Sequence, residues 1–189
     1  MLAARRVLLV ACLAVAVARG LAAQALRDAP LLKGALAFDG SATLGAFTGT
    51  TTTVKGQLVG AAALAAVSGW VEAPTQSLVT GNGKRDRDMY QSLETGKYPT
   101  MRFDLEHIDA GSGQGDSVAV TLHGRFTIHG TAREAAVPGW AWLRPGATRF
   151  RGALPMDVRD YGVGGLSKML GILKMDPKLV VRIDVVFGS

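Results

Sequence analysis

The sequence predicts an all-β protein, an eight-stranded antiparallel β-barrel with one short α-helix and a short apolar helical insert. Three observations support this class. Several segments alternate apolar and polar residues, as half-buried strands do. Turn-forming residues separate these segments, and no long helical segment lies between them, which argues against parallel β–α–β units. A closed barrel suits eight strands that each have one apolar face, because closure leaves no exposed sheet edge.

The first 25 residues have the layout of a secretory signal peptide. Residues 1–6 are short and basic, residues 7–18 are all apolar, and small residues follow. An apolar run of this length is too short for a permanent membrane span. We therefore expect cleavage after Ala23 or Ala25 and a periplasmic or secreted protein. A lipobox at Cys12 is the alternative, although the apolar run continues past that residue.

Removing this leader changes the composition of the chain. The leader contains three arginines, so its loss lowers the net charge from +6 to +3. The only cysteine of the chain is lost with it. A mature chain without thiols has neither a disulfide nor a cysteine metal framework. A charge of +3 without a basic stripe gives no indication of nucleic-acid binding. Residues 26–189 are long enough for one domain with a sizeable core.

The N-terminal half contains three weaker strand candidates and the helix. The strands are expected at 34–43, 48–58 and 65–73. The helix is predicted over Lys84–Thr95, where a Gly and a Pro follow as a stop signal, and we expect it to cover one end of the barrel. Its charged residues 84–88 either hold a ligand head group or form a solvated helix face with local ion pairs.

The C-terminal half contains the clearest strands. In Ser117–His129 the apolar face carries Val118, Val120, Leu122, Phe126 and Ile128, with Gly124 as a gap. The same alternation predicts strands at 101–106, 150–158 and 181–187, and a weaker one at 133–143. Residues 110–115 and 144–146 are expected to be turns. The segment Arg159–Tyr161 is expected either at the mouth of the barrel or in a structural ion pair and turn.

The apolar insert is predicted over Ser167–Met175. It is apolar nearly all round a helix, so it should not stand in water unprotected. We expect either a lid that dips into a membrane during loading or a plug of core residues over the barrel end.

Three blocks of the sequence resemble a known family. They are Leu78–Phe103, Val120–Thr131 and Phe150–Phe187. They share a charged R-x-x-D helix segment before K-Y-P, a strand with G-x-x-T-I-x-G-x-x-R, and a late strand that leads into R-D-Y-G. In order and spacing these blocks resemble the YceI-like family, secreted bacterial proteins with a lipocalin-like barrel that bind polyisoprenoid chains.

The resemblance implies a binding protein without a cofactor. It would transport or store a lipophilic isoprenoid, either a polyisoprenoid or a quinone-like molecule, inside the barrel. The alternative is a ligand-free envelope module that binds or protects a protein partner. Transient membrane contact and a homodimer are left open.

The ligand-binding residues are expected on the apolar inner face and in the insert. They are Phe38, Met101, Phe103, Val118, Val120, Leu122, Phe126, Leu154, Met156, Met169, Leu170, Leu173, Ile183 and Val185. Small inward residues are expected to leave room for the ligand; they are Ala37, Ala73, Gly124 and Gly152.

The sequence does not predict an enzyme or a metal site. It has no G-x-S-x-G elbow, P-loop or H-E-x-x-H motif. His123 and His129 are expected on the outer face of one strand, about 20 Å apart, which is too far to share a metal. His107 is expected to stand alone. Trp140 and Trp142 are expected to share a face, where packing is favoured over stacking on a ligand ring.

Overall fold

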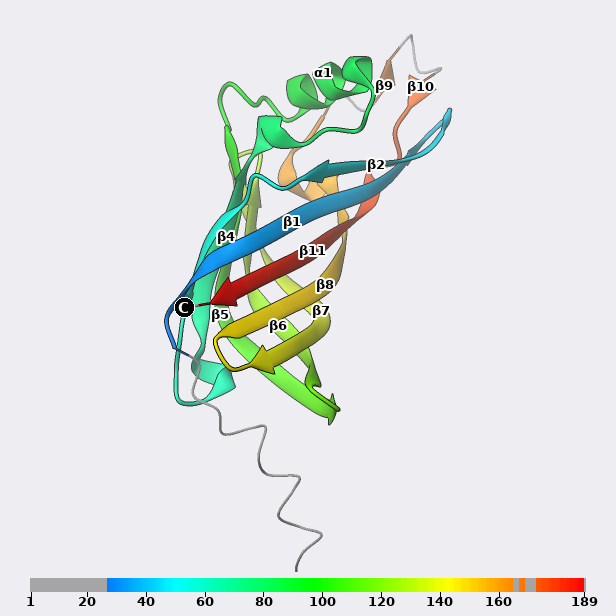
Figure 1. Cartoon of the computed structure of the whole chain (residues 1–189). Helices are drawn as coiled ribbons and strands as arrows, with labels where there is room; N and C mark the ends of the chain where they lie inside the picture. The colour runs from blue at the N-terminus through cyan, green and yellow to red at the C-terminus, as the bar shows by residue number, and fades with distance from the viewer. Residues whose placement is uncertain (1–26, 165–166, 169–172, 189) are drawn as a thin grey trace, which may run out of the picture.

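A computed structural model describes residues 27–164, 167–168 and 173–188. Its main antiparallel sheet has the order β11-β8-β7-β6-β5-β4-β3-β1-β2, and β1 also pairs with β11. This last pairing closes the sheet into a barrel (Figure 1). The predicted antiparallel barrel with one α-helix is confirmed.

The elements follow one another in the chain with short connections. The barrel strands are β1 (Ala29–Ala42), β2 (Gly45–Thr51), β3 (Lys55–Val59), β4 (Ser68–Pro74), β5 (Thr100–Gln114), β6 (Ser117–Ile128), β7 (Thr131–Arg144), β8 (Ala147–Asp157) and β11 (Lys178–Gly188). The other elements are α1 (Gly83–Ser92), the 3₁₀ turns η1 (Leu64–Ala66), η2 (Thr75–Ser77) and η3 (Val158–Tyr161), and a small hairpin of β9 (Ser167–Lys168) and β10 (Leu173–Lys174).

Two strands of this sheet share one position in the barrel. The end of β1, from Leu36 to Ala42, pairs with β2, whereas its start, Ala29 and Pro30, pairs with β3. The sequence predicted one strand over 48–58, but residues 52–54 interrupt it. Beyond the interruption only β3 continues to β4, and β2 instead forms a bridge from Thr50 to Val79. Nine strands therefore make a barrel with eight strand positions.

The fifth strand is much longer than predicted. The alternation indicated residues 101–106, yet β5 runs to Gln114, and the expected turn at 110–115 is wrong for most of its length. The reason is that the glycine-rich end stays extended by pairing with β6, with Ala110 opposite Val120 and Gly113 opposite Val118. Only Gly115 and Asp116 form the turn.

A β-bulge in β5 changes which side chains face inward. Leu105 pairs with Gly124, but the next register pair is His107 with His123, so Glu106 is an extra residue. A bulge of this kind re-aims the side chains that follow it. Ile108, only 7% exposed, consequently faces the core, while His107 is exposed on the outside.

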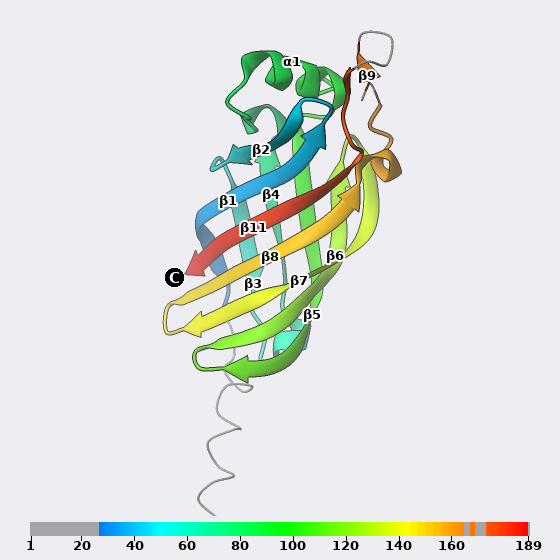
Figure 2. The same cartoon turned by 90° about the vertical axis from the view of Figure 1, so that its right-hand side faces the viewer.

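The helix α1 covers one end of the barrel, as predicted (Figures 1 and 2). It begins after Asn82, whose side chain accepts hydrogen bonds from the amides of Lys84 and Arg85. Asp86 in its first turn accepts hydrogen bonds from the amide and hydroxyl of Thr80, which tie the preceding loop to the helix. None of the helices in the described part of the chain has the length and apolar character needed to span a bilayer.

The helical insert predicted at 167–175 is wrong where the structure describes it. Ser167–Lys168 and Leu173–Lys174 pair with each other as antiparallel strands. The backbone of this segment finds partners at the β1–β2 turn: the Thr43 amide donates to the Lys174 carbonyl, and the Asp176 amide donates to the Ser41 carbonyl. Because these partners satisfy an extended backbone, a helix has no advantage here.

The small inward residues serve strand packing more than space for a ligand. A Cβ on Gly124 would overlap the carbonyl oxygen of Asp104 on β5, and a Cβ on Gly152 would lie 2.7 Å from the carbonyl oxygen of Pro138 on β7. Of the four small residues expected to leave room, Ala37 borders the barrel cavity. The expectation for Gly124 and Gly152 is wrong because neighbouring backbone, and at Gly152 also the Phe150 ring, fills the space.

We expect Gly124→Ala to destabilise the barrel by about 1–3 kcal/mol, because the added methyl group forces β5 and β6 apart. The midpoint and slope of urea denaturation measure this change. Gly113→Ala on the same strand pair is the control, since its Cβ would lie 3.5 Å from the nearest atom, an ordinary contact. Equal midpoints for the two variants would contradict the close-approach role of Gly124.

Candidate ligand-binding cavity

The barrel encloses a cavity of about 630 Å³. This volume lies in the range of about 300–1,000 Å³ that is typical of small-molecule sites. Its wall is formed by apolar side chains from β1, β3, β4, β5, β6, β7, β8 and β11. An apolar space of this kind suits a hydrocarbon ligand in chemical character, because burial removes apolar surface from water.

Most of the predicted site residues that the structure describes border this cavity. They are Phe38, Met101, Phe103, Val120, Leu122, Phe126, Met156, Ile183 and Val185. Of the other described candidates, Val118 and Leu154 pack against the core outside the lining. Met169, Leu170 and the side chain of Leu173 lie outside the described residues. The role of each residue as a ligand contact stays a prediction.

Sequence reasoning missed several residues of the cavity wall. Leu36 and Leu58 are buried in the weakly alternating strands β1 and β3, and Leu78 lies in a loop that carries no periodic signal. Ile108 was hidden by the bulge in β5. Phe150 begins the strand predicted at 150–158, but it was not named among the ligand-binding residues. Its large apolar side chain was the one sequence signal that could have identified it.

The cavity opens at the end of the barrel that carries α1. Here the lining becomes polar, with exposed Lys84 and half-buried Arg85 and Asp88 from α1 and exposed Lys174 from β10. Leu44 at the β1–β2 turn also borders the opening and is 83% exposed. Three cationic side chains and one carboxylate give this mouth a net positive charge.

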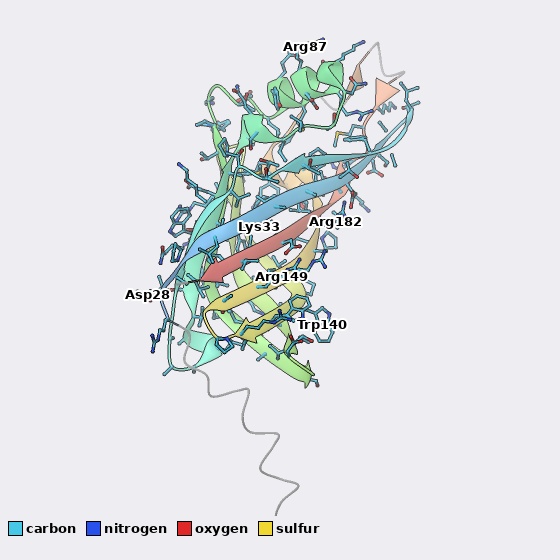
Figure 3. All side chains as sticks on the ribbon, viewed as in Figure 1. Asp28, Lys33, Arg87, Trp140, Arg149 and Arg182 are labelled. Carbon is cyan, nitrogen blue, oxygen red and sulfur yellow. The ribbon has the colours of Figure 1, made fainter. Side chains whose placement is uncertain are left out.

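The charged residues 84–88 do not all lie in one environment: some border the mouth of the cavity, and others face the neighbouring loop or solvent. Lys84, Arg85 and Asp88 border the mouth, and the Arg85 guanidinium lies 4.4 Å from the ring centre of Phe47. Asp86 instead binds the backbone and hydroxyl of Thr80. Arg87 points away from the barrel (Figure 3).

The segment Arg159–Tyr161 forms a structural turn, the second of the two readings considered for it. It is the 3₁₀ turn η3, which ends at Gly162 in the left-handed conformation. Tyr161 is 4% exposed and packs edge-on against Phe126, with 5.7 Å between ring centres, and burial raises the pKa of its hydroxyl. Arg159 forms an ion pair with Asp157. The turn therefore anchors β8 below the mouth.

We expect Asp157 to remain ionised at about pH 3, because hydrogen bonds from Arg159 lower the pKa of its carboxyl from 3.8 to about 2. A lowered pKa means that this stabilising interaction is complete above pH 3.8 and is lost as the pH falls through about 2. A carboxyl-carbon NMR titration measures the midpoint. Arg159→Gln should raise it toward 3.8.

Arg133→Gln is the control for this titration, since Arg133 contacts the same turn through the Asp160 carbonyl. It should leave the Asp157 midpoint low. An Asp157 titration midpoint near 3.8 in the wild-type protein would show that the ion pair with Arg159 does not persist in solution.

His123 lies on the outer face of β6 as predicted, but the predictions for the other two histidines are wrong. His107 is not alone: it is paired with His123 across β5 and β6, and the two rings stack with 4.5 Å between their centres. His129 is not on the outer face of β6. It has a positive φ of 53° in the turn after the strand, where it packs against Tyr98 and its side chain is 14% exposed.

The two tryptophans of β7 contribute to the outer wall. Trp140 is 41% exposed, and Figure 3 shows it on the outside of the barrel. Trp142 lies 5.8 Å below the guanidinium of Arg149 on β8. Packing with arginine, rather than stacking on a ligand ring, accounts for Trp142.

A family model of the YceI-like domain matches residues 33–187. The chain belongs to the YceI-like family. The match covers every barrel strand, although β1 begins before it. The resemblance drawn from the sequence blocks is thereby confirmed.

Solved structures show the same YceI-like fold at low sequence identity. A polyisoprenoid-binding domain from Saccharophagus degradans, implicated in plant cell wall breakdown, has a TM-score of 0.71 and 18% identity, over 85% of this chain and 98% of that one. BcnA of Burkholderia cenocepacia has a TM-score of 0.65 and 16% identity, over 81% and 95%.

The YCEI protein of Campylobacter jejuni is a more distant match. Its TM-score is 0.52 and its identity 15%, over 65% of this chain and 72% of that one. Curated protein sequences give no match to this chain. At these identities the structures establish the fold alone.

Proposed function

We propose that this YceI-like protein binds and carries a lipophilic isoprenoid, a polyisoprenoid or quinone-like molecule, without catalysis. The observation that carries the proposal is the apolar cavity of about 630 Å³ enclosed by the barrel. Each buried CH₂ group of a chain contributes about 0.8 kcal/mol. A dozen carbons inside therefore offset the free-energy costs of ordering a flexible ligand. The polyisoprenoid-binding domain from Saccharophagus degradans supports the same ligand class.

The ligand's polar head belongs at the mouth in this proposal. The deep wall offers apolar contacts from residues such as Phe126 and Ile183, whereas Lys84, Arg85 and Lys174 gather at the opening. A buried polar head without partners would be costly. An anionic head, such as a prenyl phosphate, gains from the positive balance at the mouth.

The proposal places this carrier in the bacterial periplasm or outside the cell, after removal of residues 1–25. The support is the signal-peptide layout of the sequence. Leu44, exposed beside the cationic mouth, is the side chain that would first contact a membrane during loading. Basic residues near an anionic membrane surface strengthen such a contact.

The test is whether a lipophile co-purifies with the protein expressed in a bacterium. Organic extraction followed by mass spectrometry should give an isoprenoid from the wild-type protein. Leu122→Arg places a charge inside the cavity and should abolish co-purification of the isoprenoid. Ala141→Phe fills the cavity without burying a charge and should reduce the yield, so a folding failure of the first variant does not decide the test.

Thr121→Arg is the matched control, because Thr121 precedes Leu122 on β6 and lies on its outer side. It should retain the lipophile. A well-folded wild-type protein whose extract contains no lipophile, and which does not bind added geranylgeraniol, would overturn the proposal. It would favour the alternative of a ligand-free module with a protein partner.

The mouth should favour geranylgeranyl phosphate over geranylgeraniol. An exposed charge pair contributes up to about 1 kcal/mol, so Lys84→Gln and Lys174→Gln should each lower phosphate affinity roughly fivefold. The alcohol's affinity should hardly change. Tryptophan fluorescence titration measures both constants. Lys33→Gln on the outer wall is the control (Figure 3), and an equal loss for both ligands would argue against head-group recognition.

A further inference from the structure

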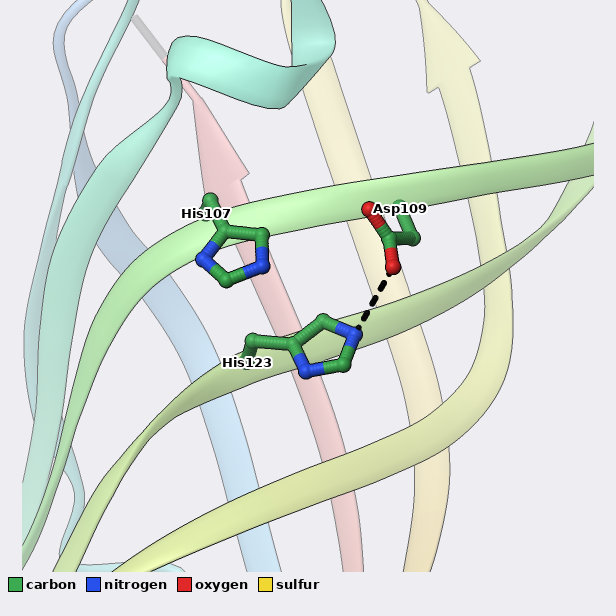
Figure 4. Close-up of side chains that lie close together, drawn as sticks. All are labelled: His107, Asp109 and His123. Carbon is green, nitrogen blue, oxygen red and sulfur yellow. Dashed lines mark ion pairs between the residues drawn. The ribbon is translucent and has the colours of Figure 1, made fainter.

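The outer wall of β5 and β6 brings two imidazoles and a carboxylate together (Figure 4). His107 and His123 are direct partners in the strand register, and their rings are parallel within 1° at a centre distance of 4.5 Å. Asp109 lies two residues beyond His107 on β5, so it shares the same face. Its Oδ2 atom is 3.0 Å from Nε2 of His123.

The bulge at Glu106 creates this cluster. Leu105 faces the cavity, so an uninterrupted strand would turn His107 and Asp109 inward as well, because side chains alternate. The extra residue moves both to the outside, where His107 is opposite His123 and Asp109 is opposite Thr121. Glu106 itself pairs with Arg125, 3.3 Å away, and is not one of the three converging groups.

We propose that His107, Asp109 and His123 bind a divalent transition-metal ion, Zn²⁺ or Cu²⁺, on the outer wall of the barrel. One ligand atom from each residue lies within 4.8 Å of the other two. Ligands about 2.1 Å from a tetrahedral ion lie about 3.4 Å from one another. The exposed side chains of His107 and Asp109 can close this gap of at most about 1.4 Å by rotation.

The chemistry of the three groups selects the class of ion. Imidazole nitrogens favour Zn²⁺ and Cu²⁺, whereas Mg²⁺ and Ca²⁺ favour oxygen ligands alone. Nε2 of His123 is shielded from solvent, and the Asp109 carboxylate oxygen lies 3.0 Å from it. Because Asp109 is itself one of the three proposed ligands, a metal ion would bind between these two groups. Water completes the coordination, since the Asp109 side chain is 69% exposed.

This site is independent of the proposed isoprenoid cavity. The inward neighbours Ile108 and Leu122 border the cavity, while the three metal ligands lie on the opposite side of the sheet. Failure of metal binding would therefore leave the carrier proposal untouched, and the reverse also holds.

Isothermal titration of the full chain with ZnCl₂ and CuCl₂ tests the site. Every protein carries Cys12→Ser, so that its thiol does not contribute, and no histidine tag. We expect one ion per chain, with Cu²⁺ bound more tightly than Zn²⁺. His107→Gln and His123→Gln should each lower affinity at least about tenfold. Cu²⁺ electron paramagnetic resonance should show two coordinated imidazoles in the parent and one in each variant.

Glu106→Gln is the matched control, because it removes a neighbouring carboxylate on the same strand and should leave affinity unchanged. Asp109→Asn changes an exposed side chain and should leave the fold intact, and thermal unfolding followed by circular dichroism checks each protein. The proposal is overturned if the parent shows no saturable binding of one ion. It is also overturned if folded His107→Gln, His123→Gln and Asp109→Asn bind as the parent does.

Discussion

The pairing of β1 with β11 is the constraint on which the rest of this structure depends. It runs from Leu31 opposite Phe187 to Asp39 opposite Val180, and it joins strands from the two ends of the domain. Without it the sheet would have two long free edges, which are sites of aggregation. The cavity would also lose a wall, since Phe38 and Ile183 border it from these two strands.

Surface ion pairs join β11 to its two neighbours, β1 and β8. They contribute less to closure of the barrel than the backbone hydrogen bonds and the apolar interior do. Arg182 on β11 pairs with Asp39 on β1, and Arg149 on β8 pairs with Asp184 on β11. The hydrogen bond from Arg149 lowers the pKa of Asp184. Partly exposed pairs of this kind are each worth a fraction of a kcal/mol up to about 1 kcal/mol. The ladder of backbone hydrogen bonds and the buried side chains behind it therefore keep the barrel closed.

The sequence was informative where one strand has one buried face along its whole length. β6, β8 and β11 alternate without interruption, and α1 has a recognisable stop signal, so their positions could be predicted. A single extra residue such as Glu106 leaves no mark in the pattern, yet it decides that Ile108 belongs to the cavity wall. The contact of Thr43 with Lys174 spans 131 residues, so no local rule could have shown that residues 167–168 and 173–174 pair as strands.

The same limits apply to the candidate site. Phe126 and Leu154 carry the same alternation signal, but Phe126 borders the cavity whereas Leu154 packs beside it. That difference depends on how neighbouring strands pack, which one strand's pattern does not contain. The pairing of His107 with His123 needed the register of two strands, and that register depends on the bulge.

The antiparallel pairing of β1 with β11 also decides where a second molecule can be joined to the two ends of the domain. The start of β1 and the end of β11 lie side by side in the part of the barrel away from α1, while the mouth lies under α1 (Figures 1 and 2). A fluorescent reporter, a surface tether or a fusion partner joined before β1 or after β11 would lie away from the mouth. The barrel could thus be immobilised with its opening facing freely into solution.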